Sequence, residues 1–518
     1  MTKLRSFRQP ARYVALLAGA APVAAFPGLD LEFLAWVGLV PGFLVLRAAP
    51  NGRDAAVRGW WFGTGYMLAA VYWLAPSLGP ALLLVAIVLG APWAGIGLAC
   101  WHLLSGRPTA GRAAAALVVL PSIWVLIDWL RSWQGIGGPW AVYGATQWQH
   151  PAVLALAAVG GIWLVTFALV AANTGITIAL TAASGLSREA GAAGAAVAIA
   201  AGPAAFAVTA AAPVTGHVTL ALVQPGLKGP GLSVQGSEFH LTSAVRGADL
   251  VVWGESGIDH DLNVDHGLVS QLAALSASVG ARLLVSTDSL NPAGQKSKVA
   301  VLVGPDGIEG SYIKTRLVPF GEYIPFRPVL GWLTRISKAA PLNMIHGNGA
   351  RVLHAVLPDG RRLAFGVLIC FESAFPDMSR VDTDQGAQLL IYQTSDATFQ
   401  GSWAPEQHAS LAALRAAETG RPAVQAALSG DSAAFDDRGR LLAWAGTNVR
   451  GVRLVTIALP ATSAKTPFDL AGDYVPWFSI AVVAISIAAL VRRRLMRIAD
   501  HDPRNDHHLR QRRIKQSG

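Results

Sequence analysis

Residues 363–373 read LAFGVLICFES, in which a short apolar run leads directly into Cys370. A run of this length that ends in polar residues is typical of a buried β-strand. Helix-like stretches, such as HASLAALRAAE (408–418), alternate with further runs of the same kind. Those further runs are HVTLALV (217–223), DLVVW (249–253), RLLVS (282–286), VAVLVG (299–304) and QLLIYQ (388–393). Strands that alternate with helices in this way predict one α/β domain with a buried sheet.

The chain as a whole is too apolar to be a soluble protein. Of its 518 residues, 53% are hydrophobic and 14% are charged, whereas an ordinary soluble domain has roughly 25% charged residues. A wholly soluble enzyme and a disordered protein are therefore poor fits. Two cysteines in a chain of this length also exclude a disulfide-rich scaffold.

The excess of apolar residues lies in runs of membrane-spanning length, about 20 residues each. We expect seven spans before the α/β domain and an eighth after it. These spans lie near residues 13–29, 31–48, 60–79, 81–104, 113–130, 157–182, 190–212 and 475–491. The sequence thus predicts a multi-pass α-helical membrane bundle (1–212), an extramembrane α/β domain (213–470), a C-terminal transmembrane helix (471–492) and a basic tail (493–518).

The net charge of +10 indicates how the protein is oriented. It resides in the two tails, residues 1–12 and 492–518, and the basic residues of the short loops between spans lie almost all on the same side as these tails. Arg131 alone lies in a loop on the other side. Basic tails beside apolar segments are typical of cytoplasmic anchors, not of nucleic-acid binding. We therefore expect both termini in the cytoplasm and the α/β domain on the outer face.

Three polar residues come shortly after apolar strands, namely Glu255, Lys314 and Cys370. Strand ends are where α/β sheets place their ligands. A cysteine with a carboxylate and an ammonium beside it forms a nucleophile, a general base and an oxyanion stabiliser. Taken singly, each residue also has an ordinary structural interpretation: a buried cysteine, a helix-capping glutamate and a solvated lysine.

The words around these residues resemble a known family. VVWGES (251–256), YIKTRLVPFGEYIP (312–325) and LICFES (368–373) resemble, in this order, the three signature blocks of the nitrilase superfamily. With the predicted spans and the loop DWLRSWQGIGGPW (128–140), the chain resembles the apolipoprotein N-acyltransferase family over nearly its whole length.

The resemblance implies a nitrilase-like αββα catalytic domain and assigns roles to individual residues. Glu255 would be the general base, Lys314 the oxyanion-stabilising lysine and Cys370 the nucleophile. Glu322, Phe371 and Glu372 would support this triad, and for the two glutamates a purely structural hydrogen-bonding role stays open. No cofactor and no metal ion is implied.

The implied reaction is a two-stage acyl transfer at the bacterial cytoplasmic membrane. Cys370 would take an acyl chain from a glycerophospholipid such as phosphatidylethanolamine and hold it as a thioester. The α-amino group of the N-terminal diacylglyceryl-cysteine of an apolipoprotein would then receive it, which is the last step of lipoprotein maturation. Neither nucleic acid nor a cofactor takes part.

Two further segments bear on the substrate pocket. Residues 326–347 are apolar with few strand signals, so they form either a membrane-dipping arm over the site or an ordinary surface loop. Ser395, Asp396, Ala397, Thr398 and Phe399 stand where the family often has Asn-Asp-Ala/Ser-Trp-Phe, a departure that concerns the pocket and not the triad.

Two other functions compete with acyl transfer. A membrane-tethered amidase of the nitrilase type would use the same triad with water as the acceptor, although an enzyme for small amides needs no eight-span anchor. A transporter or scaffold with an inactive outer domain is disfavoured, because all three triad residues are present and charged residues deep in the spans are sparse.

Overall fold

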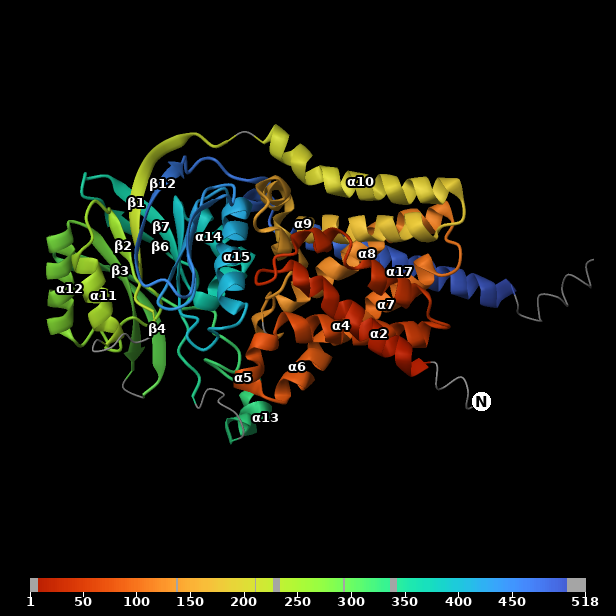
Figure 1. Ribbon diagram of the computed structural model, residues 1–518, viewed down its shortest axis with the longest axis horizontal. Coiled ribbons are helices and arrows are strands. Elements are labelled where there is room, and N and C mark those ends of the chain that lie inside the picture. Colours follow the sequence, from red (N-terminus) through yellow and green to blue (C-terminus); the bar gives the residue numbers. More distant parts are fainter. Residues whose placement is uncertain are drawn as a thin grey trace, which may run out of the picture.

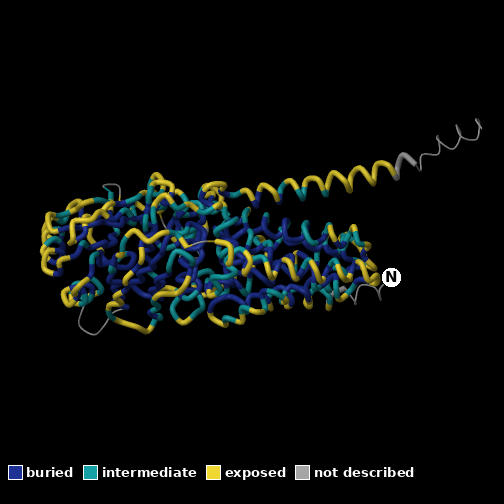
Figure 2. Tube along the Cα trace, turned by 90° about the horizontal axis from the view of Figure 1, so that it is seen from above, coloured by how far each residue is buried: buried dark blue, intermediate teal, exposed yellow. Residues whose placement is uncertain are grey.

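The computed structural model describes residues 8–136, 138–209, 211–226, 233–291, 294–335 and 342–500. A helical bundle and an α/β sandwich lie end to end along the long axis of the molecule (Figure 1). One cluster of buried apolar side chains extends from the bundle, at Trp124, into the sandwich, at Phe365. The two parts thus share a continuous core, which the buried trace of Figure 2 follows across the junction.

The first sheet of the sandwich has six strands in the order β12-β1-β2-β3-β4-β5. β1, β2 and β3 run parallel, and the other neighbours pair antiparallel. The strands are β1 (Val214–Gln224), β2 (Leu250–Val252), β3 (Arg282–Leu290), β4 (Lys296–Gly304), β5 (Gly307–Ile313) and β12 (Gly451–Pro460). Helices α11 (Val234–Ser243) and α12 (His266–Val279) lie on its outer face (Figure 1).

The second sheet repeats this plan, with the order β11-β10-β9-β8-β7-β6 and a parallel centre of β7, β8 and β9. Its strands are β6 (Val352–Val356), β7 (Arg362–Ile369), β8 (Leu389–Thr394), β9 (Ala423–Ala427), β10 (Ser432–Phe435) and β11 (Leu441–Ala445). Helices α14 (Pro376–Asp384) and α15 (Ala404–Thr419) cover the face towards the bundle (Figure 1). The predicted αββα fold is confirmed, and all six strands predicted from apolar runs are present.

The bundle is built from helices of very different lengths. Its longer helices run roughly parallel to one another, away from the sandwich (Figure 1). They are α2 (Arg8–Ala20), α3 (Val40–Arg47), α4 (Gly52–Ala70), α6 (Ala81–Gly90), α7 (Ala94–Leu104), α8 (Ala110–Arg131), α9 (Pro151–Thr181), α10 (Gly185–Val208) and α17 (Tyr474–Asp500). Short segments join them: η1 (Ala21–Ala25), η2 (Glu32–Trp36), η3 (Tyr72–Leu74), α5 (Ala75–Leu78), η4 (Ala91–Trp93), η5 (Gln134–Ile136) and η6 (Tyr143–Gln147).

Five helices of the described residues are long and apolar enough to cross a membrane. They are Ala81–Leu104, Ala110–Arg131, Pro151–Thr181, Gly185–Val208 and Tyr474–Met496, and each matches a predicted span. The other three predicted spans are interrupted: 13–29 is divided between α2 and η1, 31–48 between η2 and α3, and 60–79 among α4, η3 and α5. The number of eight spans therefore stays a prediction.

Helix α9 is broken where it meets the sandwich. Gly160 and Gly161 have non-helical backbone angles, and Gly161 has a φ of 68°. A side chain at Gly161 would collide with the ring of Phe468, whose atoms lie 2.6 Å from the position of an added Cβ. The amide of Ile162 donates to Glu418 Oε1 of α15, at 2.8 Å. The break thus ties the longest membrane helix to the helix that covers the second sheet.

Two predicted features extend beyond the described residues. Residues 501–518 of the basic tail and residues 336–341 of the predicted arm lie outside them. Within the arm, the structure places α13 (Arg327–Leu330) and η7 (Gly331–Arg335) at the edge of the molecule, at the level where the sandwich meets the bundle (Figure 1).

Candidate active site

Cys370 occupies a tight turn at the end of β7. It is the first residue of η8 (Cys370–Ala374), and its φ of 54° lies in the left-handed region that non-glycine residues rarely adopt. His408 of α15 donates from Nε2 to the Cys370 carbonyl oxygen at 3.1 Å, while its Nδ1 lies 2.9 Å from Asp396 Oδ1. Burial acts to lower the pKa of His408, but Asp396 and the Cys370 carbonyl outweigh burial, so the pKa is raised. The imidazole supports the turn through its hydrogen bond to the Cys370 carbonyl.

Glu255 is placed by a close approach of the two sheets. It follows β2 after Gly254, where an added Cβ would lie 1.9 Å from the backbone nitrogen of Leu428, so only glycine fits. The amide of Glu255 donates to the carbonyl of Thr394, at the end of β8 in the other sheet, at 3.0 Å. The general-base candidate therefore depends on both sheets for its position.

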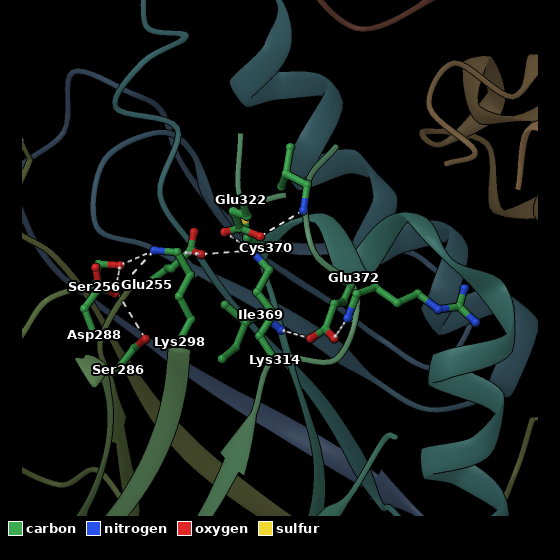
Figure 3. A network of polar contacts seen from close by, with 12 residues as sticks. Glu255, Ser256, Ser286, Asp288, Lys298, Lys314, Glu322, Ile369, Cys370 and Glu372 are labelled. Atoms are coloured by element: carbon green, nitrogen blue, oxygen red, sulfur yellow. Dashed lines mark hydrogen bonds and ion pairs between the residues drawn. The ribbon is translucent and has the colours of Figure 1, made fainter. Parts of the chain in front are cut away.

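Lys314 connects the acidic groups of the site. It follows β5, is fully buried, and donates from Nζ to Glu255 Oε1 at 3.1 Å and to Glu322 Oε1 at 2.8 Å. Glu322 is itself fixed, because its Oε2 accepts the amide of Val318 at 2.9 Å. Figure 3 shows that Glu255, Glu322 and Cys370 gather around the Lys314 ammonium.

The pKa shifts within the cluster determine which of its groups carries a proton at neutral pH. Burial alone would raise the pKa of Glu255, but Lys298 and Lys314 lower it, together with a hydrogen bond to Cys370, to about 2. Burial and the charge of Glu255 raise the pKa of the Cys370 thiol well above its ordinary value. Burial acts to lower the pKa of Lys314, but the negative charges of Glu255 and Glu322 outweigh burial and raise this pKa well above its ordinary value. At neutral pH the site thus holds a carboxylate, an ammonium and a neutral thiol.

Glu372 faces the backbone and not Lys314. Its Oε2 accepts the amide of Ile369 at 2.7 Å, and its Oε1 accepts the amides of Thr315 and Arg316 at 2.7 and 2.9 Å and the Tyr312 hydroxyl at 2.7 Å. Although burial raises the pKa of Glu372, these donors act against that rise. The side chain therefore ties the turn before Cys370 to the loop that follows Lys314.

Phe371 faces the membrane bundle. Its ring packs edge-on against Phe375, with centroids 5.0 Å apart. Gly138, in the loop after α8, lies so close that an added Cβ would be 2.4 Å from the Phe371 ring. The same loop accepts the Tyr323 hydroxyl on the carbonyl of Gln134 at 2.9 Å. The loop that follows α8 thus covers the side of the site that faces the bundle.

The structure brings three of the predicted residues, Glu255, Glu322 and Cys370, around the ammonium of the fourth, Lys314. Phe371 and Glu372 lie beside the nucleophile. Sequence reasoning missed two residues. Lys298 lies 3.4 Å from Glu255 Oε1, and His408 lies beneath Cys370. A histidine within the apolar helix 408–418 was an available signal, but nothing local marked Lys298. Among the described residues, no group of three or more His, Cys, Asp or Glu side chains is placed to hold a metal ion.

Comparison with known proteins covers both parts of the chain. Residues 18–175 match the model of the apolipoprotein N-acyltransferase N-terminal domain, and residues 207–465 match that of carbon-nitrogen hydrolase. An apolipoprotein N-acyltransferase of Caulobacter vibrioides is 30% identical over 531 residues, which cover 92% of this chain and 94% of the relative. One of Geobacter metallireducens is 25% identical over 519 residues, with 93% and 95% covered.

Among solved structures, a mutant of the amidase from Nesterenkonia sp. AN1, with an acetamide moiety on its active-site cysteine, is 21% identical to this chain. The match covers 52% of this chain and 95% of the amidase, with a TM-score of 0.35.

Proposed function

Since this chain belongs to the apolipoprotein N-acyltransferase family and N-acylates lipoproteins, we propose that it does so through a thioester on Cys370, with Glu255 as the general base and Lys314 as the oxyanion stabiliser. The observation that supports these roles is the convergence of the three side chains in one cluster, in which Glu255 and Lys314 are buried and Cys370 is partly buried.

In the first stage, Cys370 attacks the acyl ester of a glycerophospholipid. As the sulfur–carbon bond forms, the thiol proton passes to Glu255, the carboxylate hydrogen-bonded to it. The tetrahedral oxyanion lies against the Lys314 ammonium. When the ester bond breaks, Glu255 returns the proton to the leaving alkoxide, and a lysophospholipid departs.

In the second stage, the α-amino group of a diacylglyceryl-cysteine attacks the thioester. Glu255 accepts the proton of the amine, the amide bond forms, and the proton passes to the sulfur as Cys370 leaves. Water competes with the amine at this stage. The burial of Glu255, Lys314 and Glu322 and the apolar pair of Phe371 and Phe375 limit its access to the thioester.

The site serves substrates that stay in the bacterial cytoplasmic membrane, with phosphatidylethanolamine as the acyl donor. The sandwich lies on the outer face and both termini are cytoplasmic. In support, the first described helix begins and α17 ends at the end of the bundle opposite the sandwich (Figure 1). The excess of basic residues in both tails favours the same orientation.

The segment 326–335 acts as an arm that enters the lipid beside the site. Large apolar side chains project from it into solvent: Phe326 is 62% exposed, Val329 71% and Trp332 54%. Exposed apolar side chains close together on a soluble surface are unfavourable, whereas a lipid interface accommodates them. The arm leaves the chain directly after the block that contains Lys314 and Glu322, so its position is coupled to the site.

The amidase alternative has less support, because relatives that match nearly the whole chain are apolipoprotein N-acyltransferases. The helical bundle also covers the site through the loop 128–140, a feature that hydrolysis of a small soluble amide does not require.

Intact-mass measurement on the purified full-length protein in detergent tests the proposal. With phosphatidylethanolamine alone, we expect the mass of the protein to increase by one acyl chain on Cys370. When diacylglyceryl lipopeptide is added, the protein loses this acyl chain and the mass of the lipopeptide increases by the same amount. Cys370→Ala loses roughly 10⁴-fold or more of the transfer rate. Cys100→Ala serves as the matched control, because Cys100 is buried in α7.

A lipopeptide that gains no acyl chain, or equal transfer by wild type and Cys370→Ala, contradicts the proposal. Release of free fatty acid without any transfer to the lipopeptide supports the hydrolase alternative instead.

A further inference from the structure

We propose that Lys298 is a second lysine of the active site, a positioning residue that keeps Glu255 ionised and oriented towards Cys370. This inference rests on the acyl transfer through Cys370 proposed above. It concerns a residue outside the motif blocks, on a strand and not in a catalytic loop.

The side chain of Lys298 reaches the general base directly. It extends from β4, is 13% exposed, and places Nζ 3.4 Å from Glu255 Oε1. The Lys314 ammonium lies 3.1 Å from the same oxygen. Figure 3 shows the two lysines approaching Glu255 from different strands.

Lys298 also holds the turn from which Glu255 projects. Its Nζ donates to the Ser256 hydroxyl at 2.6 Å, and that hydroxyl donates to Asp288 Oδ1 at 2.8 Å. Asp288 Oδ1 is 3.4 Å from Nζ as well, which closes a triangle of polar contacts. Ser256 has a φ of 58°, a strained value for serine, so the turn needs such side-chain contacts to keep its shape.

The surrounding charges determine what loss of Lys298 does. The ionisable groups that act on Glu255 or on Lys298 come from several elements: Lys298, Lys314, Cys370, Glu322, Asp288 and His408. Burial raises the pKa of Glu255, and the charges of Lys298 and Lys314, in this order, are the largest influences that lower it. Without Lys298, the pKa of Glu255 therefore rises, and the carboxylate becomes protonated and inactive as a base at a higher pH.

The test compares Lys298→Met with Lys298→Arg and with the control Lys296→Met. Lys296 lies two residues away on the same strand, is 53% exposed and reaches Asp288 Oδ2 at 3.9 Å, but no contact joins it to Glu255. For the full-length protein with phosphatidylethanolamine, the rate of acyl-enzyme formation is measured across the pH range. We expect Lys298→Met to move the acid limb up by about 1 to 3 pH units.

Three further results are expected. Lys298→Arg keeps the wild-type limb because it keeps the charge, and Lys296→Met behaves like wild type. The effect of Lys298→Met appears in kcat and not in the KM for phospholipid, because Lys298 acts through Glu255. An unshifted acid limb in Lys298→Met, or an equal loss at every pH in both Lys298 variants, overturns the proposal.

The rate at which iodoacetamide alkylates Cys370 is a second measurement, and it needs no lipid. The Cys370 thiol must pass its proton to Glu255 before it reacts, so the acid limb of alkylation shifts in Lys298→Met as well, with Cys370→Ala as the background. Absence of an acyl-enzyme in the wild type contradicts the proposed function alone. An unshifted alkylation profile in Lys298→Met contradicts the role of Lys298, whatever happens with lipid.

Discussion

The helical bundle and the active site of the sandwich both bury charged side chains, but they pair them in different ways. In the bundle, the pairs between two buried side chains are local: Arg58 lies 2.8 Å from Asp54, four residues before it, and Arg131 lies 2.6 Å from Asp128. In the sandwich, the charges of the site converge from separate loops and strands, and the Lys314 ammonium contacts two glutamates at once.

This difference separates two uses of buried charge. A pair on one helix forms as soon as the helix does. Its two charges neutralise each other, so neither charge is left to bind a ligand, and the pair serves to fix loops and helix ends. A cluster assembled from several elements forms only in the complete fold. Each lysine of the cluster has more than one acidic neighbour, so one of these neighbours can change its protonation state during a reaction.

The largest expected effect tests the converging cluster. Glu255→Gln removes the proton acceptor, and we expect the rate of acyl-enzyme formation to fall by roughly 10² to 10⁴-fold. The fold survives, because Lys314 keeps Glu322 and Lys298 keeps Asp288. Intact-mass kinetics and thermal unfolding in detergent measure the two quantities. If Glu255→Gln reacted at the wild-type rate, or if its Tm fell strongly, the site cluster would not differ from the bundle pairs in the way proposed.

The second prediction breaks a local pair. Asp128→Asn removes the charge that neutralises the buried Arg131 guanidinium, whose further contacts with the carbonyls of Trp140 and Ala141, the Met67 sulfur and the Trp93 ring are all uncharged, so we expect a loss of about 3 to 5 kcal/mol in stability. Thermal unfolding in detergent should show a large fall in Tm, whereas the folded fraction loses less activity than Glu255→Gln.

An exposed pair gives the control for this loss. Asp377, which is 47% exposed, pairs with Arg316 at the surface, and Asp377→Asn should cost at most about 1 kcal/mol. Equal shifts in Tm for Asp128→Asn and Asp377→Asn would show that burial of the local pair does not matter.

The third prediction concerns an intermediate case. Glu372 lies among converging loops, but backbone amides and the Tyr312 hydroxyl, not a lysine, saturate its oxygens. Glu372→Gln replaces one acceptor oxygen by a donor, which leaves at least one buried amide unpaired at a cost of about 1 to 3 kcal/mol. Chemical denaturation and kinetics together measure it. A rate loss as large as that of Glu255→Gln, without a loss of stability, would indicate a direct chemical role.

Local sequence patterns predicted an α/β domain with a buried sheet, and the resemblance of three sequence blocks to a known family added the two-sheet fold and the roles of the site residues. Six of the strands are short apolar runs, and Glu255 and Cys370 directly follow two of them, whereas Lys314 follows the mainly polar strand β5. Lys298 could not be found in this way. It lies in the sequence QKSK beside Lys296, and only the antiparallel register, in which Lys298 pairs with Asp288 of β3, turns it towards the general base.

The apolar runs of the membrane part were predictable, but the breaks within them were not, even in matched spans such as 81–104, which contains η4. Mean hydropathy measures how apolar a segment is, not where its helical hydrogen bonds stop. Residues 31–48 are apolar enough for a span, yet η2 and α3 divide them. The break in α9 depends on Phe468 and Glu418, which follow it by more than two hundred residues.

That break also bears on how the protein is made. A ribosome delivers α9 long before Glu418, so during synthesis the amide of Ile162 lacks the carboxylate that accepts it in the finished molecule. An unpaired buried amide is costly, and the newly inserted bundle therefore stays incomplete at this point until the sandwich has folded. The catalytic domain thus also completes a helix of the membrane anchor, and a chain truncated before α15 presents an unfinished helix to the quality-control proteases of the cell.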